Sequence, residues 1–138
     1  GWNFVFGQAS LYDRVGVWSI YRNGDPDESE AMFRLCLLRT IKTAVHEIGH
    51  ILTIRHCIEY ECVMNGSNHR EESDQRPLYL CPVCLKKLCW NLGIDPLKRY
   101  KKLGTFCLKN NLIKEAEFFH QAVLVLNSKF QAPNSNIQ

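Results

Sequence analysis

The 138-residue sequence predicts an α+β fold. Two short runs of aromatic and β-branched residues near the amino terminus are typical of strands. A long stretch with apolar residues at helical spacing follows them. Periodicity is then lost, and it returns in shorter helical segments toward the carboxyl terminus. A chain of this length is one domain's worth of sequence and can bury a core.

The predicted strands are Trp2–Phe6 and Val15–Tyr21, and a turn around Asp13-Arg14 joins them. Two strands alone form a marginal sheet. The sequence therefore predicts a small sheet that packs on the long helix.

The long helix follows a loop rich in Gly, Pro and Asp that runs from Tyr21 to Ser29. Ser29 or Asp27 is expected to cap a helix that continues to about Thr53. Its apolar residues form a stripe centred on Ile48, which we expect to face the core. The polar residues opposite that stripe would then face away from the core, where another segment could cover them to make a cleft.

Two histidines and a glutamate on this polar side form a His-Glu-x-x-His pattern. His46 and His50 are four residues apart, so one helical face brings both rings toward one ion, with Glu47 beside them as a base. A third histidine, His56, can join them only if the chain turns after Leu52. Three imidazoles leave one coordination position open, which is the mark of a catalytic zinc. The alternative is two solvated histidines and an accidental third.

Four cysteines in two close pairs form a second candidate metal site: Cys57, Cys62, Cys81 and Cys84. Four thiolates complete a tetrahedron and leave no position for water, so we interpret this set as a structural zinc site rather than as disulfides or buried apolar cysteines. His56 and Cys57 are neighbours, and adjacent side chains of an extended segment point in opposite directions. The structural ion would thereby brace the third histidine.

The remaining three cysteines, Cys36, Cys89 and Cys107, have no evident partner. Free thiols beside thiolate ligands favour a reducing, cytoplasmic compartment. No apolar run approaches the roughly 18 residues needed to span a bilayer, so no membrane association is expected.

Charge is unevenly distributed around a net value of +3. Residues 1–80 carry 8 basic and 11 acidic side chains, and residues 81–138 carry 9 and 3. The basic end could bind nucleic acid or an acidic partner, but a solvated helix face is the preferred interpretation. Nucleic-acid binding is therefore not expected.

Three helical segments are predicted toward the carboxyl terminus. The first, residues 85–92, is opened by Pro82, the second starts at Asp95-Pro96 and ends near Leu103-Gly104, and the third covers Ile113–Leu126. The last two faintly resemble one unit of a helical repeat, although capping of the domain is the preferred role.

The joined histidine and cysteine pattern resembles that of the archaemetzincins, a branch of the metzincin zinc metallopeptidases. The pattern reads His46-Glu47-x-x-His50-x5-His56-Cys57-x4-Cys62-x-Met64, followed by Cys81-x2-Cys84. Further likenesses are Asn3–Gly7, Gly66–Asn68 and Arg76–Leu78, and the resemblance covers residues 2 to about 103.

This resemblance implies a metzincin-like zincin fold with a small sheet, shorter than the family's because upstream strands are missing, packed on a long active-site helix. A zinc-stapled loop region and carboxyl-terminal helices would follow. We expect a catalytic domain over residues 1–103, a helical extension over residues 104–130 and a disordered tail over residues 131–138.

The resemblance also implies roles for single residues. Two zinc ions are expected: a catalytic one on His46, His50 and His56, and a structural one on the four cysteines. Glu47 would be the general base, and Met64 would form a turn beneath the catalytic ion. Without the resemblance, a Met at this position could simply fill a gap in the core. The implied activity is that of an intracellular protease or aminopeptidase acting on a peptide or protein substrate.

One departure from the family pattern affects the third ligand. Metzincins usually have Gly three residues after the second histidine, and this sequence has Thr53. Either Thr53 adopts a positive φ at a cost of about 1–2 kcal/mol, or the turn takes another route. This departure and the absent upstream strands keep a second function open, a zinc-bound peptide-binding module with impaired catalysis. A third is a nucleic-acid or protein adaptor built on the four-cysteine site and the basic carboxyl-terminal end. His69 could orient substrate, but a solvated loop histidine is the simpler interpretation.

Overall fold

The structure of the protein is a computed structural model that describes residues 6–131. Its backbone forms two compact units, residues 1–93 and residues 94–138, which are described separately. The boundary predicted at residue 103 falls inside a helix of the second unit. The predicted tail lies almost entirely outside the described residues.

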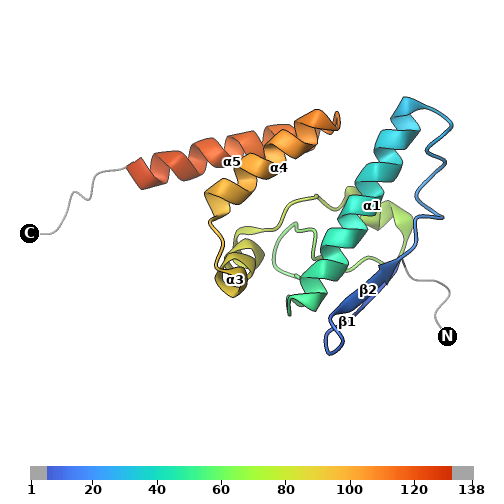
Figure 1. The fold of residues 1–138 in the computed structure, drawn as a ribbon, viewed down its shortest axis with the longest axis horizontal. Coiled ribbons are helices and arrows are strands. Elements are labelled where there is room, and N and C mark those ends of the chain that lie inside the picture. Colours follow the sequence, from blue (N-terminus) through green and yellow to red (C-terminus); the bar gives the residue numbers. More distant parts are fainter. Residues whose placement is uncertain (1–5, 132–138) are drawn as a thin grey trace, which may run out of the picture. The chain divides into compact units, whose positions relative to one another are not determined.

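The first unit opens with an antiparallel hairpin of β1 (Gly7–Ser10) and β2 (Val15–Trp18), in which Gly7 lies opposite Trp18. The hairpin packs against the long helix α1 (Figure 1). Of the predicted strand Trp2–Phe6, residues 2–5 lie outside the described part, and the first strand among the described residues runs over Gly7–Ser10.

Helix α1 (Glu30–Ile51) begins as predicted at Ser29, whose Oγ accepts a hydrogen bond from the Met32 amide at 3.1 Å. Its burial differs from the prediction. Ile48, the centre of the apolar stripe, is 44% exposed, whereas His46 and Glu47 are buried. The stripe indicates which face is apolar but not which face other segments cover. In the folded chain, the segment after α1 covers the histidine face.

The end of α1 is a Schellman motif, which reverses the chain. The Thr53 amide donates to the His50 carbonyl and the Ile54 amide donates to the Gly49 carbonyl, both at 2.9 Å. Thr53 occupies the left-handed position of this motif with φ +68°. Thr53 therefore adopts the positive φ that was the first of the two alternatives, and the chain makes its usual turn without glycine.

Beyond this turn the chain forms a loop, the short helix α2 (Arg70–Gln75) and the helix α3 (Pro82–Leu92). Helix α3 extends the predicted segment back to Pro82 and ends at Gly93, whose φ is +62°. Helix α2 was not predicted, because none of its six residues is apolar and no periodicity marks it. The loop supplies fully buried core residues, Cys62, Val63 and Met64.

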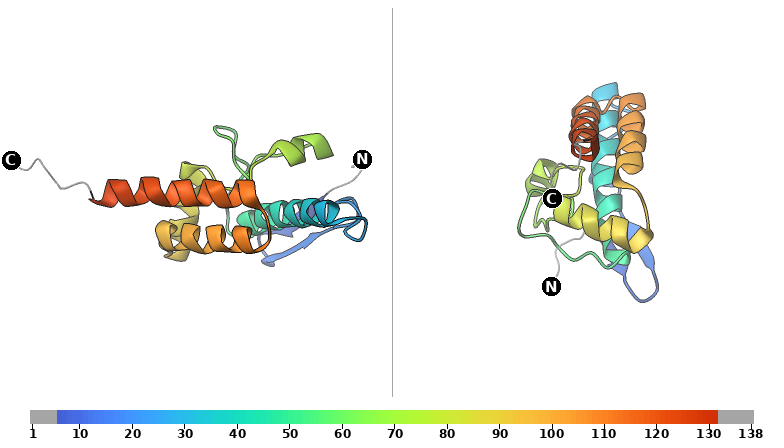
Figure 2. Two further views of the ribbon diagram at one scale, coloured as in Figure 1. Left: turned by 90° about the horizontal axis from the view of Figure 1, so that it is seen from above. Right: turned by 90° about the vertical axis from the view of Figure 1, so that its left-hand side faces the viewer.

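The second unit is a hairpin of two helices, α4 (Pro96–Lys109) and α5 (Ile113–Gln131), which lie side by side in both views of Figure 2. The predicted ends near Leu103-Gly104 and Leu126 are wrong, because both helices continue. Gly104 is a contact residue rather than a helix end: a Cβ there would lie 2.9 Å from the His120 ring. Within the described residues, no helix is both long and apolar enough to cross a bilayer.

Candidate metal centres and active-site cleft

Three histidine rings converge where α1 ends and the next loop begins. The Nε2 atom of His46 lies 3.1 Å from that of His50 and 3.2 Å from that of His56. A tetrahedral zinc with Zn–N bonds of about 2.0–2.1 Å sets its nitrogen ligands about 3.3 Å apart. The spacing of the three nitrogens therefore fits one ion.

Backbone carbonyls fix the tautomers of two of these rings. Nδ1 of His46 lies 2.8 Å from the Val63 carbonyl oxygen, and Nδ1 of His50 lies 2.8 Å from that of Ile54. Because a carbonyl only accepts, both Nδ1 atoms carry the proton and both Nε2 atoms present a lone pair. Lone pairs meeting at this distance repel unless a cation lies between them, so the donor set fits a metal ion.

Burial adjusts the charges at this site. It lowers the pKa of His46 to about 4, with the nearby Arg76 guanidinium acting in the same direction. Burial also lowers the pKa of His56, so both rings are neutral at neutral pH, as a metal ligand must be. For Glu47, burial raises the pKa, and His50 and Arg76 partly offset that rise.

A cleft of about 670 Å³ opens in front of the three rings. Strand β1 forms one wall, and the loop residues Ser67 and Asn68 belong to the lining. Glu47 reaches the cleft beside the histidines although it is only 6% exposed. Its carboxylate lies against Gly7, where an added Cβ would be 2.9 Å from Oε1. Glycine at this position lets the strand pass close to the glutamate.

Met64 packs beneath the histidine helix. It is fully buried, and a Cβ added at Gly49 would lie 2.7 Å from its Cε atom. The Met64 carbonyl also accepts a hydrogen bond from the Cys57 amide at 2.9 Å. The turn at Val63-Met64 thus contacts the helix that carries two of the histidines and the backbone of one of the four cysteines.

The four predicted cysteines form the second cluster. Their sulfur atoms all lie within 4.8 Å of one another, and none forms a disulfide. The sulfurs of Cys57 and Cys81 are 3.8 Å apart, which suits two thiolates on one tetrahedral zinc with Zn–S bonds of about 2.3 Å. Amide groups donate to two of the sulfurs: Cys81 N–H to Cys62 Sγ at 3.3 Å and Cys84 N–H to Cys81 Sγ at 3.4 Å.

The structure thus places all predicted site residues in two clusters, with Glu47 and Met64 next to the first. The adjacent His56 and Cys57 belong to different clusters, as their alternating directions predict. His69 is exposed and lies 3.0 Å from Glu71, so it is solvated rather than turned into the cleft. Sequence reasoning assigned no role to Gly7, Gly49 or Arg76, and only the likeness of Asn3–Gly7 and Arg76–Leu78 to the family pattern marked two of them.

Comparison with known proteins identifies the family. The family model described as peptidase family M54 matches residues 1–89, which is most of the first unit. The chain belongs to peptidase family M54. This assignment confirms the resemblance to the archaemetzincins predicted from the histidine and cysteine pattern.

Members of this M54 family from distant organisms are similar to the chain. It is 44% identical over 128 residues to archaemetzincin-2 of Macaca fascicularis, an alignment that covers 74% of this chain and 36% of that protein. It is 40% identical over 99 residues to archaemetzincin of Thermococcus kodakarensis, covering 68% and 51%. The chain therefore spans between about a third and a half of the length of these relatives.

Solved structures of M54 proteins confirm the fold. Archaemetzincin from Methanopyrus kandleri matches with a TM-score of 0.59 at 38% identity, over 68% of this chain and 49% of that one. Archaemetzincin from Archaeoglobus fulgidus, solved in complex with malonate, matches with a TM-score of 0.53 at 39% identity, over 63% and 51%. The predicted metzincin-like α+β fold is correct.

Proposed function

We propose that this M54 protein is a zinc metallopeptidase that hydrolyses peptide bonds in the cleft above His46, His50 and His56. The convergence of three Nε2 atoms next to a buried carboxylate carries this proposal. When bound by the three imidazoles, a zinc ion supplies Lewis-acid chemistry: it lowers the pKa of water to about 7 and polarises a carbonyl.

Glu47 is the proposed general base. Its carboxylate takes a proton from the attacking water and delivers it to the nitrogen of the leaving amine. The raised pKa that burial gives Glu47 suits the first step, because a stronger base accepts the proton more readily. The absence of a side chain at Gly7 leaves room for the carboxylate at the cleft wall.

A peptide in extended conformation is the proposed substrate, because a strand forms one wall of the cleft. Phe6, Gly7, Gln8 and Ala9 line it, and an extended peptide can pair with such a backbone. Aminopeptidase activity is one form of the proposed hydrolysis. Peptides with a free amino terminus, compared with their acetylated forms, distinguish it from internal cleavage.

We further propose two zinc ions per chain, the second held by the four cysteines, and a cytoplasmic location in keeping with seven cysteines that form no disulfide among the described residues. Metal analysis of the purified protein should give two zinc, of which a chelator removes one readily through the open cleft. The thiolate-bound ion should leave slowly.

The Glu47→Gln variant tests the activity. It should bind the same amount of zinc as the unchanged protein and lose turnover on a mixed peptide library by about 10²-fold or more. Full activity in this variant would refute the assignment of Glu47. Zinc binding without cleavage by the unchanged protein would instead support the peptide-binding module.

A further inference from the structure

A buried arginine lies behind the histidine cluster. Arg76 follows the last residue of α2, is only 9% exposed, and lines the cleft with His46 and Glu47. Burial lowers the pKa of Arg76 and the Glu47 carboxylate opposes this, but a guanidinium stays charged at neutral pH. A buried charge is costly unless its N–H groups find acceptors. The acceptors of Arg76 therefore indicate what it does.

The guanidinium of Arg76 binds the turn that contains Met64. Its Nη1 donates to the Asn65 carbonyl at 2.6 Å and lies 3.5 Å from the Val63 carbonyl. Its Nη2 donates to Ser73 Oγ at 3.0 Å. One nitrogen thus faces both carbonyls that flank Met64, and the other ties the group to α2.

This same turn orients the first histidine of the cluster. The Val63 carbonyl accepts the Nδ1 proton of His46, and the Met64 side chain packs on Gly49. Nη1 of Arg76 also lies 3.1 Å from Nδ1 of His46, but both groups are donors, so this contact is not a hydrogen bond. Arg76 reaches the ring through the turn rather than directly.

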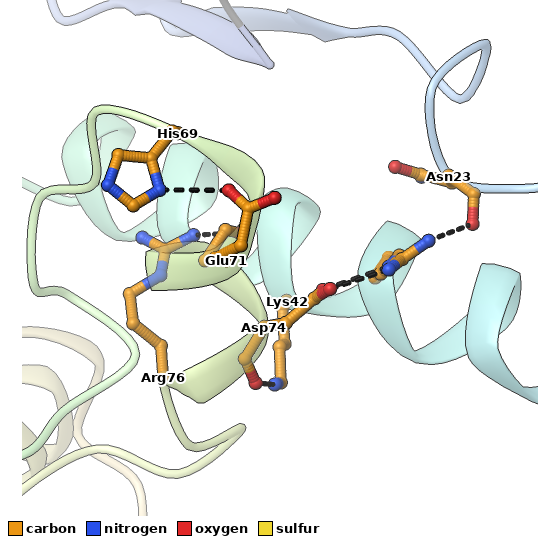
Figure 3. Close-up of polar contacts among 8 residues, drawn as sticks. Asn23, Lys42, His69, Glu71, Asp74 and Arg76 are labelled. Atoms are coloured by element: carbon orange, nitrogen blue, oxygen red, sulfur yellow. Dashed lines mark hydrogen bonds and ion pairs between the residues drawn. The ribbon is translucent and has the colours of Figure 1, made fainter.

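Helix α2 is anchored to α1 independently of Arg76. Two nitrogens of Arg39 donate to the two carboxylate oxygens of Asp74, at 2.8 and 2.5 Å. The Asp74 carbonyl accepts a hydrogen bond from Lys42 Nζ at 2.8 Å (Figure 3). Arg39 also donates to the Asn23 carbonyl. Arg39 therefore secures the packing of α2 on α1, and the guanidinium of Arg76 is available to bind the turn.

We propose that Arg76 is a positioning residue of the histidine metal site. It fixes the Val63 carbonyl, which fixes the ring of His46, so that Nε2 of His46 points to the place where the other two nitrogens converge. This inference rests on the part of the proposed function in which the histidines bind zinc, and it does not require peptide hydrolysis.

The charge of Arg76 and its hydrogen-bond geometry have opposite effects on zinc binding, so the variant that tests the proposal must keep the charge. A cation near the site disfavours a second cation, so removal of the charge of Arg76 would by itself strengthen zinc binding. Arg76→Lys keeps the charge, but one ammonium cannot reach Asn65 and Ser73 together as the planar fork does. Arg39→Lys is the matched control, because it is the same substitution in the other arginine whose fork binds α2, and Arg39 does not contact the turn.

The experiment measures zinc affinity site by site in the full chain. Competition with a chromophoric chelator gives the affinity of the weaker site, and cobalt substitution separates the thiolate charge-transfer bands of the cysteine cluster from the ligand-field bands of the histidine site. We expect Arg76→Lys to weaken the histidine site about tenfold with altered ligand-field bands and unchanged thiolate bands. Arg39→Lys should lower the melting temperature and leave that affinity unchanged.

Three results would overturn the proposal. They are an unchanged affinity in Arg76→Lys, an equal loss of affinity in both variants, and a joint loss of the histidine and thiolate signals or of the helical circular dichroism. The second would assign Arg76 to the packing of α2, and the third to the fold as a whole. Because no substrate is used, a wild-type protein without peptidase activity would leave this test intact.

Discussion

The histidine cluster and the cysteine cluster meet at the neighbouring residues His56 and Cys57, yet the histidine cluster is open and the cysteine cluster is closed. The three imidazoles face a cleft of about 670 Å³, whereas Cys62, Cys81 and Cys84 are at most 3% exposed. Closure by four ligands suits an ion that holds the chain together, and three ligands beside a cleft suit an ion that meets a substrate. The difference lies in the number of donors and in what covers them.

The two clusters also differ in how their ligands are held. Two of the histidines come from one helix, and backbone carbonyls orient their rings. The cysteine cluster instead joins Cys57 to Cys81, 24 residues apart, across a segment with one short helix. A segment with so little regular structure depends on its cross-link for its shape. The cysteine cluster should therefore support the histidine cluster, and the reverse dependence should be weak.

Cys81→Ser should have the largest effect and tests this dependence directly. It should remove one zinc per chain, lower the stability by about 4 kcal/mol or more, and lower the melting temperature by about 15 °C or more. The histidine site should weaken with it, because His56 is next to a ligand of the lost ion. Zinc analysis and thermal unfolding measure these effects.

Cys89→Ser is the control for Cys81→Ser, since Cys89 lies on α3 outside both clusters. It should keep both ions and change the melting temperature little. A Cys81→Ser protein that has one zinc fewer but melts at the wild-type temperature would contradict the asymmetry between the two centres.

Gly49→Ala should have an intermediate effect, confined to the open centre. The added methyl group would press on Met64, which costs about 1–3 kcal/mol, while the better helix propensity of alanine returns about 1 kcal/mol. The net loss of up to about 2 kcal/mol should appear in thermal unfolding, together with weaker zinc binding at the histidines and unchanged thiolate bands.

A double-mutant cycle identifies Met64 as the cause. Met64→Ala alone leaves a cavity and should cost about 2–5 kcal/mol. Combined with it, Gly49→Ala should no longer destabilise and should instead return the roughly 1 kcal/mol of alanine's better helix propensity, because the opposing side chain is gone. Simple additivity of the two losses would show that the two residues do not act on each other.

The two clusters of candidate metal ligands could be predicted from the sequence because local spacing determines them. His46 and His50 share a helical face at any position of that helix, and close cysteine pairs have few other uses in a chain without disulfides. The turn at Thr53 could be framed as two alternatives for the same reason, since a Schellman motif is local.

The features that escaped prediction depend on packing between distant segments. Arg76 acts through carbonyls more than ten residues away, and Gly7 matters because Glu47 lies against it. The apolar stripe on α1 suggested that Ile48 faces the core, but coverage of the other face depends on the loop that carries the cysteines. Gly104 was interpreted as a helix end although it is a helix contact. Local patterns contain none of this information.

Thr53→Gly should have the smallest effect, and it tests how far the histidine cluster, the open centre, depends on the turn after α1. Thr53 is exposed with φ +68°, a conformation that costs a β-branched residue about 1–2 kcal/mol. Glycine relieves this strain but gains more freedom in the unfolded chain, which returns part of the difference. The variant should therefore be more stable by about 0.5–1 kcal/mol, and its melting temperature should rise by a few degrees.

Zinc affinity at the histidines should not change in Thr53→Gly, and this is the informative half of the prediction. The hydrogen bonds that reverse the chain use backbone atoms of residues 49–54, and the Ile54 carbonyl that orients His50 belongs to the same turn. Glycine can keep all of them. Isothermal titration with zinc, after chelation of the open centre, measures the affinity. A tighter site in the glycine variant would show that Thr53 strain reaches His50, and that the open centre is less preorganised than its carbonyl contacts imply.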